Sequence, residues 1–282
     1  MSTIKEAFKK GQGLLKEFPQ PSVEARLLLL KAASISEEKF HSSPDARLSR
    51  KEERQFYKLI SRRKAGFPLA YLTGIKEFWS IPFRVEEGIF IPRPETELMV
   101  EKVVELSGGE NGKNETIVDI GTGCGSIAVS LAKELPDARI TATDNSRKAL
   151  KLARLNASRQ QVSNITFVRG SLFAPLKKRL EKKCDFIVSN PPYVSEREWK
   201  DLSPEIKNHE SKQAVVAGGE GLEFIQQLIL GAPVYLKPGG YLIIEIGEGQ
   251  KETVLSLFGD EWSEVKSYND LNKIPRLVTA QI

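Results

Sequence analysis

The chain has 282 residues, of which 40% are hydrophobic and 28% charged, which is ordinary for a globular protein of one or two domains. The amino end shows no basic segment followed by an apolar one, and the leucine run 27–30 is too short to span a bilayer. We therefore expect a cytoplasmic protein without a membrane segment. His41 and His209 leave little material for a His-based metal site or a Ser-His-Asp triad, so we expect no metal. Cys124 and Cys184 form no CxxC pair, and we expect two buried thiols.

Residues 1–75 contain 15 Lys and Arg against 8 Asp and Glu, a net charge of +7, while the whole chain has +5. Such a segment can dock an acidic protein or a nucleic acid backbone, or it can simply be the solvated faces of helices. The spacing of its apolar residues is helical, and Ser22 is a candidate N-cap. Ser49 with Glu52 predicts a capping box for a later helix that ends near Gly66. We expect a helical domain for substrate recognition.

Residues 76–100 form a bridge between this domain and the rest of the chain. Loosely alternating apolar residues predict a short hairpin, and residues 91–97, Ile-Pro-Arg-Pro-Glu-Thr-Glu, are stiff because they contain two prolines. Thr96 or Glu97 is expected to begin the next helix. One interpretation of residues 91–97 is a proline-rich linker; the other is a rigid strip that closes over a cofactor or substrate pocket.

Residues 101–282 form the third region, in which strands alternate with helices from residue 115 onward, a pattern typical of a parallel sheet. The apolar strand 116–120 leads directly into the loop Gly121-Thr122-Gly123-Cys124-Gly125. Glycines there let the backbone approach a ligand, although a lone glycine loop marks many nucleotide folds. The loop lacks the last glycine of the dinucleotide fingerprint and the Lys-Ser/Thr pair of a P-loop. An adenosine with an amino-acid tail therefore fits it better than a pyrophosphate.

Acidic and polar residues follow the neighbouring strands. Asp144 ends the second strand about 20 residues after the glycine loop, where an acid binds both ribose hydroxyls. Asp119, near the end of the first strand, can face the ammonium group of the tail or can tie down the glycine turn. After the third strand, Ser171 can bond an exocyclic amine, and Leu172 or Phe173 can pack on the adenine ring. Core packing is an equally good interpretation of Phe173.

The turn Asn190-Pro191-Pro192-Tyr193 follows the apolar run 186–188. Prolines donate no ladder hydrogen bond, so this strand ends in a rigid turn at the carboxyl edge of the sheet, where open α/β sheets bind ligands. The Asn190 oxygen and the Pro191 carbonyl can each accept one N–H of a planar –NH₂ group, and Tyr193 can stack on its plane. The alternative is a turn with a purely structural role.

In this order, the glycine loop, Asp144 and the Asn-Pro-Pro-Tyr turn resemble the class I S-adenosylmethionine methyltransferases. Together with residues 92–97, Tyr71, Gly74 and the helical first domain, they make nearly the whole chain similar to the HemK-type (PrmC) glutamine methyltransferases of peptide-chain release factors. The resemblance implies an α/β, Rossmann-like sheet, mostly parallel with an antiparallel edge strand, and a small N-terminal helical domain. Residues 277–280 are the candidate for a final edge strand.

The resemblance implies a protein-(glutamine-N5) methyltransferase that uses S-adenosyl-L-methionine, releases S-adenosyl-L-homocysteine, and acts on the Gly-Gly-Gln motif of class I release factors. The candidate cofactor residues are Gly121, Thr122, Gly123, Cys124, Gly125, Asp144, Ser171, Leu172 and Asn190. The candidate substrate residues are Asn190, Pro191, Pro192 and Tyr193, of which Asn190, Pro191 and Tyr193 are the catalytic candidates. The chain departs from the family pattern at Ser171, where an acid is frequent, at Ser211, where Pro is frequent, and at Ser80, where Gly is frequent.

Two other functions stay open on the residues alone. In DNA or RNA methylation, the same turn would hold the exocyclic amine of a flipped base stacked on Tyr193. Against this, the basic domain lacks a recognisable nucleic-acid motif. An inactive adenosine-binding docking module is the third hypothesis. We expect a monomer whose partner is a release factor, not a nucleic acid or a membrane.

Overall fold

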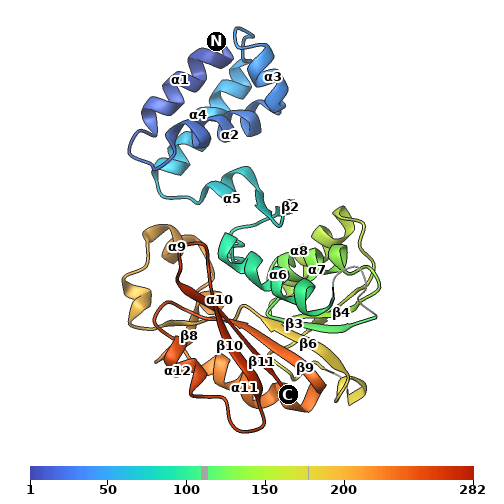
Figure 1. The fold of residues 1–282 in the computed structure, drawn as a ribbon. Helices are drawn as coiled ribbons and strands as arrows, with labels where there is room; N and C mark the ends of the chain where they lie inside the picture. Colours follow the sequence, from blue (N-terminus) through green and yellow to red (C-terminus); the bar gives the residue numbers. More distant parts are fainter. Residues whose placement is uncertain (109–113, 177) are drawn as a thin grey trace. The chain divides into compact units, whose positions relative to one another are not determined.

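The computed structural model describes residues 1–108, 114–176 and 178–282 and contains a seven-stranded sheet between residues 116 and 281 (Figure 1). Its strands in spatial order are β10 (Ser263–Asn269), β11 (Pro275–Gln281), β9 (Leu236–Glu245), β6 (Cys184–Ser189), β3 (Thr116–Ile120), β4 (Arg139–Asp144) and β5 (Ile165–Arg169). The five strands from β9 to β5 are parallel, and β11 pairs antiparallel with both β9 and β10. The predicted α/β, mostly parallel sheet is confirmed.

The edge of the sheet differs from the prediction. Residues 277–280 lie in β11, the antiparallel strand, which is one position inside the sheet, and β10 forms the edge. The prediction was wrong because β10 has no apolar run: its sequence is Ser-Glu-Val-Lys-Ser-Tyr-Asn, and none of its residues is fully buried. An exposed edge strand carries few of the apolar signals by which strands are recognised.

Each face of the sheet has its own apolar core, because successive residues of a strand point to opposite faces. Ile117 of β3 packs in one core and its neighbour Val118 in the other. The helices of the first core are α6 (Glu97–Leu106), α7 (Ser126–Glu134) and α8 (Arg147–Arg159), and those of the second are α11 (Glu223–Tyr235) and α12 (Lys251–Leu255). Burial on both faces explains why β3, β6 and the second half of β9 read as nearly continuous apolar runs.

Short elements surround this sheet. They are β1 (Ile75–Phe78) paired with β2 (Ile81–Arg84), β7 (Val194–Ser195) paired with β8 (Val216–Gly218), α10 (Lys212–Val215), and the 3₁₀ turns η1 (Pro94–Thr96), η3 (Lys178–Leu180) and η4 (Glu198–Lys200). The predicted short hairpin corresponds to β1 and β2. Thr96 is the N-cap residue of α6 and Glu97 its first residue, which confirms the predicted helix start.

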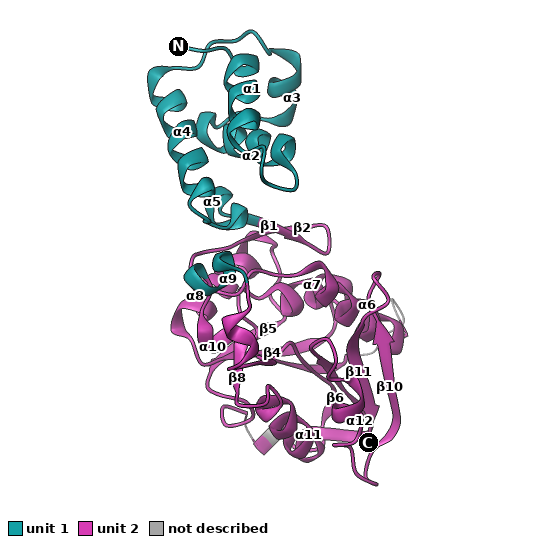
Figure 2. Cartoon of the chain, turned by 90° about the vertical axis from the view of Figure 1, so that its left-hand side faces the viewer, with its two compact units in different colours: residues 1–75, 203–209 teal, residues 76–202, 210–282 magenta. Residues whose placement is uncertain are grey.

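The chain divides into two compact units (Figure 2). Unit 1 consists of Met1–Ile75 and Ser203–His209, and unit 2 of Lys76–Leu202 and Glu210–Ile282. The helices of unit 1 are α1 (Ile4–Leu14), α2 (Pro21–Ala33), α3 (Glu37–Ser42), α4 (Arg50–Lys64), α5 (Leu69–Thr73) and α9 (Pro204–His209). The division into 1–75, 76–100 and 101–282 remains a prediction, and the structure groups α9 with the helical unit.

Local sequence signals set two helix starts in unit 1. Ser49 and Glu52 form the predicted capping box, with the Ser49 N–H 2.7 Å from Glu52 Oε2 and the Glu52 N–H 3.2 Å from Ser49 Oγ. Ser22, by contrast, is not an N-cap. α2 begins at Pro21, two residues before the start that an N-cap at Ser22 would give, because a proline is tolerated in the first turn, where its missing N–H has no helical partner to lose.

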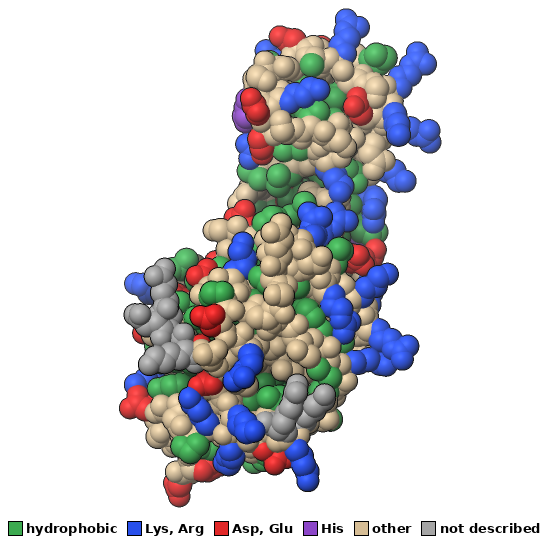
Figure 3. Space-filling view, turned by 90° about the vertical axis from the view of Figure 1, so that its right-hand side faces the viewer, with side chains coloured by type: hydrophobic (Ala, Val, Ile, Leu, Met, Phe, Trp, Pro, Cys, Tyr) green, Lys and Arg blue, Asp and Glu red, His purple; other side chains and the backbone are tan. Residues whose placement is uncertain are grey.

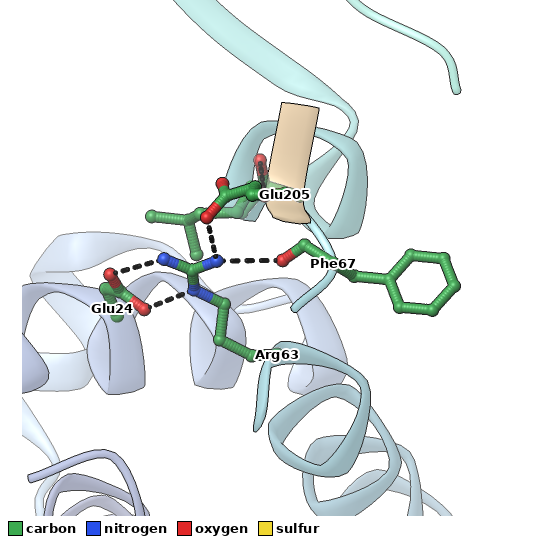
Figure 4. Close-up of polar contacts among 6 residues, drawn as sticks. Glu24, Arg63, Phe67 and Glu205 are labelled. Atoms are coloured by element: carbon green, nitrogen blue, oxygen red, sulfur yellow. Dashed lines mark hydrogen bonds and ion pairs between the residues drawn. The ribbon is translucent and has the colours of Figure 1, made fainter. Parts of the chain in front are cut away.

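Arg63 of α4 connects three segments of unit 1 (Figure 4). Its Nε donates to Glu24 Oε2 at 2.6 Å and its Nη2 to Glu24 Oε1 at 3.0 Å. Its Nη1 donates to the Phe67 carbonyl and to Glu205 Oε2 of α9, both at 2.9 Å. The ring of Phe67 also lies 4.0 Å, centroid to centroid, from that of His209. These contacts explain why α9 belongs to unit 1.

Candidate active site

The site predicted from the motifs lies at the carboxyl edge of the parallel strands. The register of β3 with its neighbours β6 and β4 places Gly121, Asn190 and Asp144 at one level, at the ends of three adjacent strands. The register of β6 with β9 brings Glu245 beside Asn190 on the other side. Motifs far apart in the sequence therefore meet at the edge where α/β sheets bind ligands.

The glycine loop serves two purposes. Gly121 and Gly123 have φ of +78° and +57°, and a Cβ added at either position would meet no atom within 4 Å. The backbone of these two residues therefore faces open space. Gly125 has φ of +86°, but a Cβ there would lie 3.0 Å from the Cβ of Ala153 in α8. Gly125 thus lets α7 pack closely against α8.

Cys124 and Cys184 are both buried and free, as predicted. The side chain of Cys124 lies in a small apolar cluster with Ile89 and Leu152, and its carbonyl accepts a hydrogen bond from Asn156 Nδ2 at 2.8 Å. Burial raises the pKa of the Cys124 thiol to about 12. The side chain of Cys124 therefore belongs to the core under the loop, and the predicted place of this residue in the cofactor site stays a prediction.

Asp144 connects the end of β4 to the glycine loop. Its Oδ2 accepts the Gly123 N–H at 2.9 Å and its Oδ1 accepts the Ser146 N–H at 2.8 Å. Burial raises its pKa, although these backbone hydrogen bonds favour the charged form and oppose that shift. Each carboxylate oxygen retains a lone pair for a further donor, which is what a pair of ribose hydroxyls requires.

Asp119 is the most unusual polar group of this edge. It is fully buried, and among the described residues neither its carboxylate oxygens nor the hydroxyl of Thr122 has a hydrogen-bond partner of good geometry. Burial raises the pKa of Asp119 to about 7, and the Asp144 carboxylate adds to the increase. An unpaired buried carboxylate is costly. Asp119 lies two residues before the glycine loop, and its pairing with the ammonium group of the cofactor tail, directly or through water, stays a prediction.

The residues proposed for the adenine ring follow β5. Ser171 is exposed and Leu172 is half-buried against the second core. Phe173 stacks on Tyr235 of α11, with ring centroids 5.4 Å apart and an interplanar angle of 6°. Of the two interpretations of Phe173, the structure supports core packing, while the roles of Ser171 and Leu172 stay predictions.

The Asn-Pro-Pro-Tyr turn is part of a polar network. Asn190 Nδ2 donates to Thr96 Oγ1 at 3.0 Å, and Thr96 Oγ1 donates to Glu245 Oε2 at 2.6 Å. The Tyr193 hydroxyl lies 3.2 Å from Glu245 Oε1. The Asn190 side chain is only half-buried, and its oxygen takes no part in these bonds. Pro191 is buried, and the part of its carbonyl as the second acceptor stays a prediction.

Sequence reasoning missed Glu245 and gave Thr96 only the start of a helix. An available signal was an acid at the carboxyl end of an apolar strand, the same signal that identified Asp144. The strip 91–97 is held at a second point, because Glu210 forms an ion pair with Arg93 and its Oε2 accepts the Ile91 N–H at 3.3 Å. These bonds support the rigid-strip interpretation over that of a linker.

Within residues 1–108, 114–176 and 178–282, no group of three or more His, Cys, Asp or Glu side chains is arranged to hold a metal ion. No helix in the same ranges is long and apolar enough to cross a membrane.

Known proteins resemble this chain along its whole length. Residues 6–74 match the PrmC N-terminal domain and residues 94–222 the methyltransferase small domain. A release factor glutamine methyltransferase of Coxiella burnetii is 35% identical over 285 residues, covering 100% of this chain and 99% of the relative. One of Bacillus subtilis is 36% identical over 289 residues, again covering 100% and 99%.

A solved structure shares the fold. A methyltransferase from Pyrococcus furiosus superimposes with a TM-score of 0.52 at 20% identity, covering 80% of this chain and 96% of the other. At that identity the likeness concerns the fold alone, whereas the two full-length relatives establish the family. The chain belongs to the release factor glutamine methyltransferases, which are S-adenosylmethionine-dependent protein-(glutamine-N5) methyltransferases.

Proposed function

We propose that this protein transfers a methyl group from S-adenosylmethionine to the side-chain nitrogen, N5, of the glutamine in the Gly-Gly-Gln motif of class I peptide-chain release factors. One observation carries the assignment of the reacting turn. The NH₂ group of Asn190 is bound by Thr96, which leaves the Asn190 oxygen as the acceptor at the sheet edge, level with Gly121.

The acceptors of the turn act on the low reactivity of the substrate amide nitrogen. An amide nitrogen is a poor nucleophile because its lone pair is delocalised into the carbonyl group. The Asn190 oxygen and the Pro191 carbonyl accept its two N–H groups, which favours localising the lone pair on nitrogen, perpendicular to the amide plane and toward the methyl donor. The Tyr193 ring fixes that plane. Holding both reactants in line can contribute roughly 7–11 kcal/mol of barrier lowering in favourable cases.

The glycine loop and the two acids hold the donor. Gly121 and Gly123 give the backbone close access, Asp144 binds the ribose hydroxyls, and Asp119 faces the ammonium group. When bound, S-adenosylmethionine supplies an electrophilic methyl group on sulfur and leaves as a neutral thioether. The chain's own residues keep the amide nitrogen aligned with that methyl group, and the extra proton on nitrogen passes to solvent after transfer.

We further propose that unit 1 docks the release factor, and that the protein acts as a cytoplasmic monomer on class I release factors rather than on nucleic acid. On the face that Figure 3 shows, Lys and Arg side chains in the upper part of the molecule stand among Asp and Glu. Residues 1–75 also contain no recognisable nucleic-acid motif. Size-exclusion chromatography with light scattering tests the monomer.

The decisive experiment is mass spectrometry of a co-expressed release factor. We expect one added methyl group on the Gly-Gly-Gln glutamine with the wild type and with Asn269→Ala, a control at an exposed asparagine on β10. Asn190→Ala should leave the release factor unmethylated while keeping S-adenosylmethionine affinity within a few-fold. A fully active Asn190→Ala, or a methyl label that appears only in nucleic acid, overturns the proposal.

A further inference from the structure

We propose that Thr96 and Glu245 are positioning residues that set the direction of the Asn190 amide, so that its oxygen and not its NH₂ group faces the substrate glutamine. This inference rests on the proposed function, since it explains how the acceptor of that reaction is held. It assigns a role in the reaction to one residue at the start of α6 and one at the end of β9.

The Thr96 hydroxyl has a single proton and can donate only one hydrogen bond. Glu245 is 2% exposed, and its Oε2 lies 2.6 Å from Thr96 Oγ1. An ionised carboxylate can only accept, so Thr96 must donate its proton to Glu245. Thr96 can then offer Asn190 only an acceptor, and the Asn190 atom 3.0 Å away must be its Nδ2. The Asn190 oxygen therefore points away from Thr96.

Tyr193 gives a second, independent constraint on the same carboxylate. Its hydroxyl lies 3.2 Å from Glu245 Oε1, the oxygen that Thr96 does not use. One carboxylate thus accepts from both reacting side chains of the turn, from Tyr193 directly and from Asn190 through Thr96. A buried network with a unique donor and acceptor pattern restricts side chains to one arrangement.

Protonation of Glu245 removes this constraint. A neutral carboxyl group can donate to Thr96 Oγ1, which frees the Thr96 proton to bond the Asn190 oxygen. The amide then turns by half a rotation and presents its NH₂ group to the NH₂ group of the substrate. Two donors cannot bond each other, so the reversed amide cannot hold the glutamine for attack.

The surroundings of Glu245 place this change near neutral pH. Burial raises the pKa of Glu245 to about 7, and the charge of Glu95 adds to the increase. The hydrogen bonds from Thr96 and Tyr193 and the charge of Arg276 act in the opposite direction. We therefore expect the active orientation to gain population as the pH rises through about 7.

Matched threonine variants test the role of the hydroxyl. Thr96→Val keeps the shape and removes the hydrogen bonds, and Thr96→Ser restores them. The control is Thr279→Val, which removes another buried threonine hydroxyl, on β11. We expect Thr96→Val to lower kcat about tenfold or more with unchanged affinity for S-adenosylmethionine measured by calorimetry. Thr96→Ser and Thr279→Val should stay near wild type in both measurements.

A second measurement, NMR of the Asn190 side chain, does not depend on catalysis. The side-chain NH₂ resonances of Asn190 are assigned by their loss in Asn190→Ala in ¹⁵N-labelled, deuterated protein. In the wild type they should exchange slowly with solvent and should shift with a midpoint near pH 7. Thr96→Val should abolish the protection, and Glu245→Gln should abolish the titration.

The outcomes separate this inference from the proposed function. If Asn190→Ala is inactive but Thr96→Val is as active as Thr279→Val, the positioning role is wrong and the reacting turn stands. If Asn190→Ala is active, the reacting turn itself is wrong. Should Thr96→Val fail to fold, the wild-type resonances decide, because an unprotected Asn190 NH₂ that does not titrate overturns the inference.

Discussion

Gly123 and Asp144 are joined by a hydrogen bond of 2.9 Å, from the backbone N–H of the loop glycine to the carboxylate Oδ2. This bond crosses from the loop after β3 to the end of β4, so it couples the two motifs that the sequence shows separately. The same carboxylate accepts the Ser146 N–H with its other oxygen. Asp144 therefore shapes the loop as well as presenting oxygens to a ligand.

Asp144→Ala should weaken S-adenosylmethionine binding by roughly tenfold to a hundredfold, because it removes charge-assisted acceptors for the ribose and releases the loop N–H. Isothermal titration calorimetry gives the Kd. Asp260→Ala, at an exposed aspartate before β10, is the matched control and should bind normally. An unchanged Kd in Asp144→Ala would remove the ribose assignment.

The affinity for S-adenosylmethionine should rise with pH up to about 7 and then level off. Asp119, whose pKa is raised to about 7 by burial, is neutral below that pH, and its proton must leave before the carboxylate can pair with the ammonium group. The neighbouring ionisable group is Asp144, whose charge favours the neutral form. Calorimetry at pH 6 in two buffers of different ionisation enthalpy should show proton release on binding.

The control for this pH dependence is Asp119→Asn, which cannot ionise. Its affinity for S-adenosylmethionine should be lower than that of the wild type at pH 8 and should not increase as the pH rises to about 7. A wild-type affinity that is flat from pH 6 to pH 8, with no proton released, contradicts the assignment of Asp119.

Asp119→Asn should also stabilise the protein without ligand at high pH. The ordinary pKa of 3.8 applies to the unfolded chain and about 7 to the folded one, so the free energy of unfolding falls between these values as the pH rises. The asparagine variant avoids this loss, which is on the order of 1.4 kcal/mol per pKa unit. Thermal unfolding of both proteins at pH 5 and pH 8 measures this difference. The gain in the free energy of unfolding of Asp119→Asn over the wild type should be larger at pH 8.

Arg63→Ala should destabilise unit 1 by about 3–5 kcal/mol, because it leaves the Glu24 carboxylate buried without its partner. The two side chains are 7% and 8% exposed, so solvent cannot replace the lost contact. Arg54→Ala, at an exposed arginine of the same helix, is the control. Hydrogen exchange of the unit 1 amides provides the measurement, and equal effects of the two substitutions contradict the prediction.

Much of the site could be predicted from the sequence because its signals are local. Two prolines after an apolar run end a strand whatever the rest of the chain does, and the glycines fix where the backbone can turn with positive φ. The capping box of Ser49 and Glu52 was predictable for the same reason, since both partners lie within one helical turn.

Only the tertiary structure revealed which distant groups meet. Thr96 and Glu245 are 149 residues apart, and Arg63 and Glu205 are 142 apart. The register between β6 and β9 sets Glu245 beside Asn190, and it depends on how whole strands pack. The raised pKa of Asp119 likewise follows from its burial and not from its neighbours in the sequence.

The sequence alone therefore determined the alternation of strands and helices from residue 115, the turns and the chemical types of the reacting groups, because each depends on backbone geometry over a few residues. The tertiary structure decided the edge strand, the grouping of α9 with unit 1 and the direction of the Asn190 amide. These depend on strand register, on desolvation and on the sharing of single protons between side chains, which exist only once distant segments have packed together.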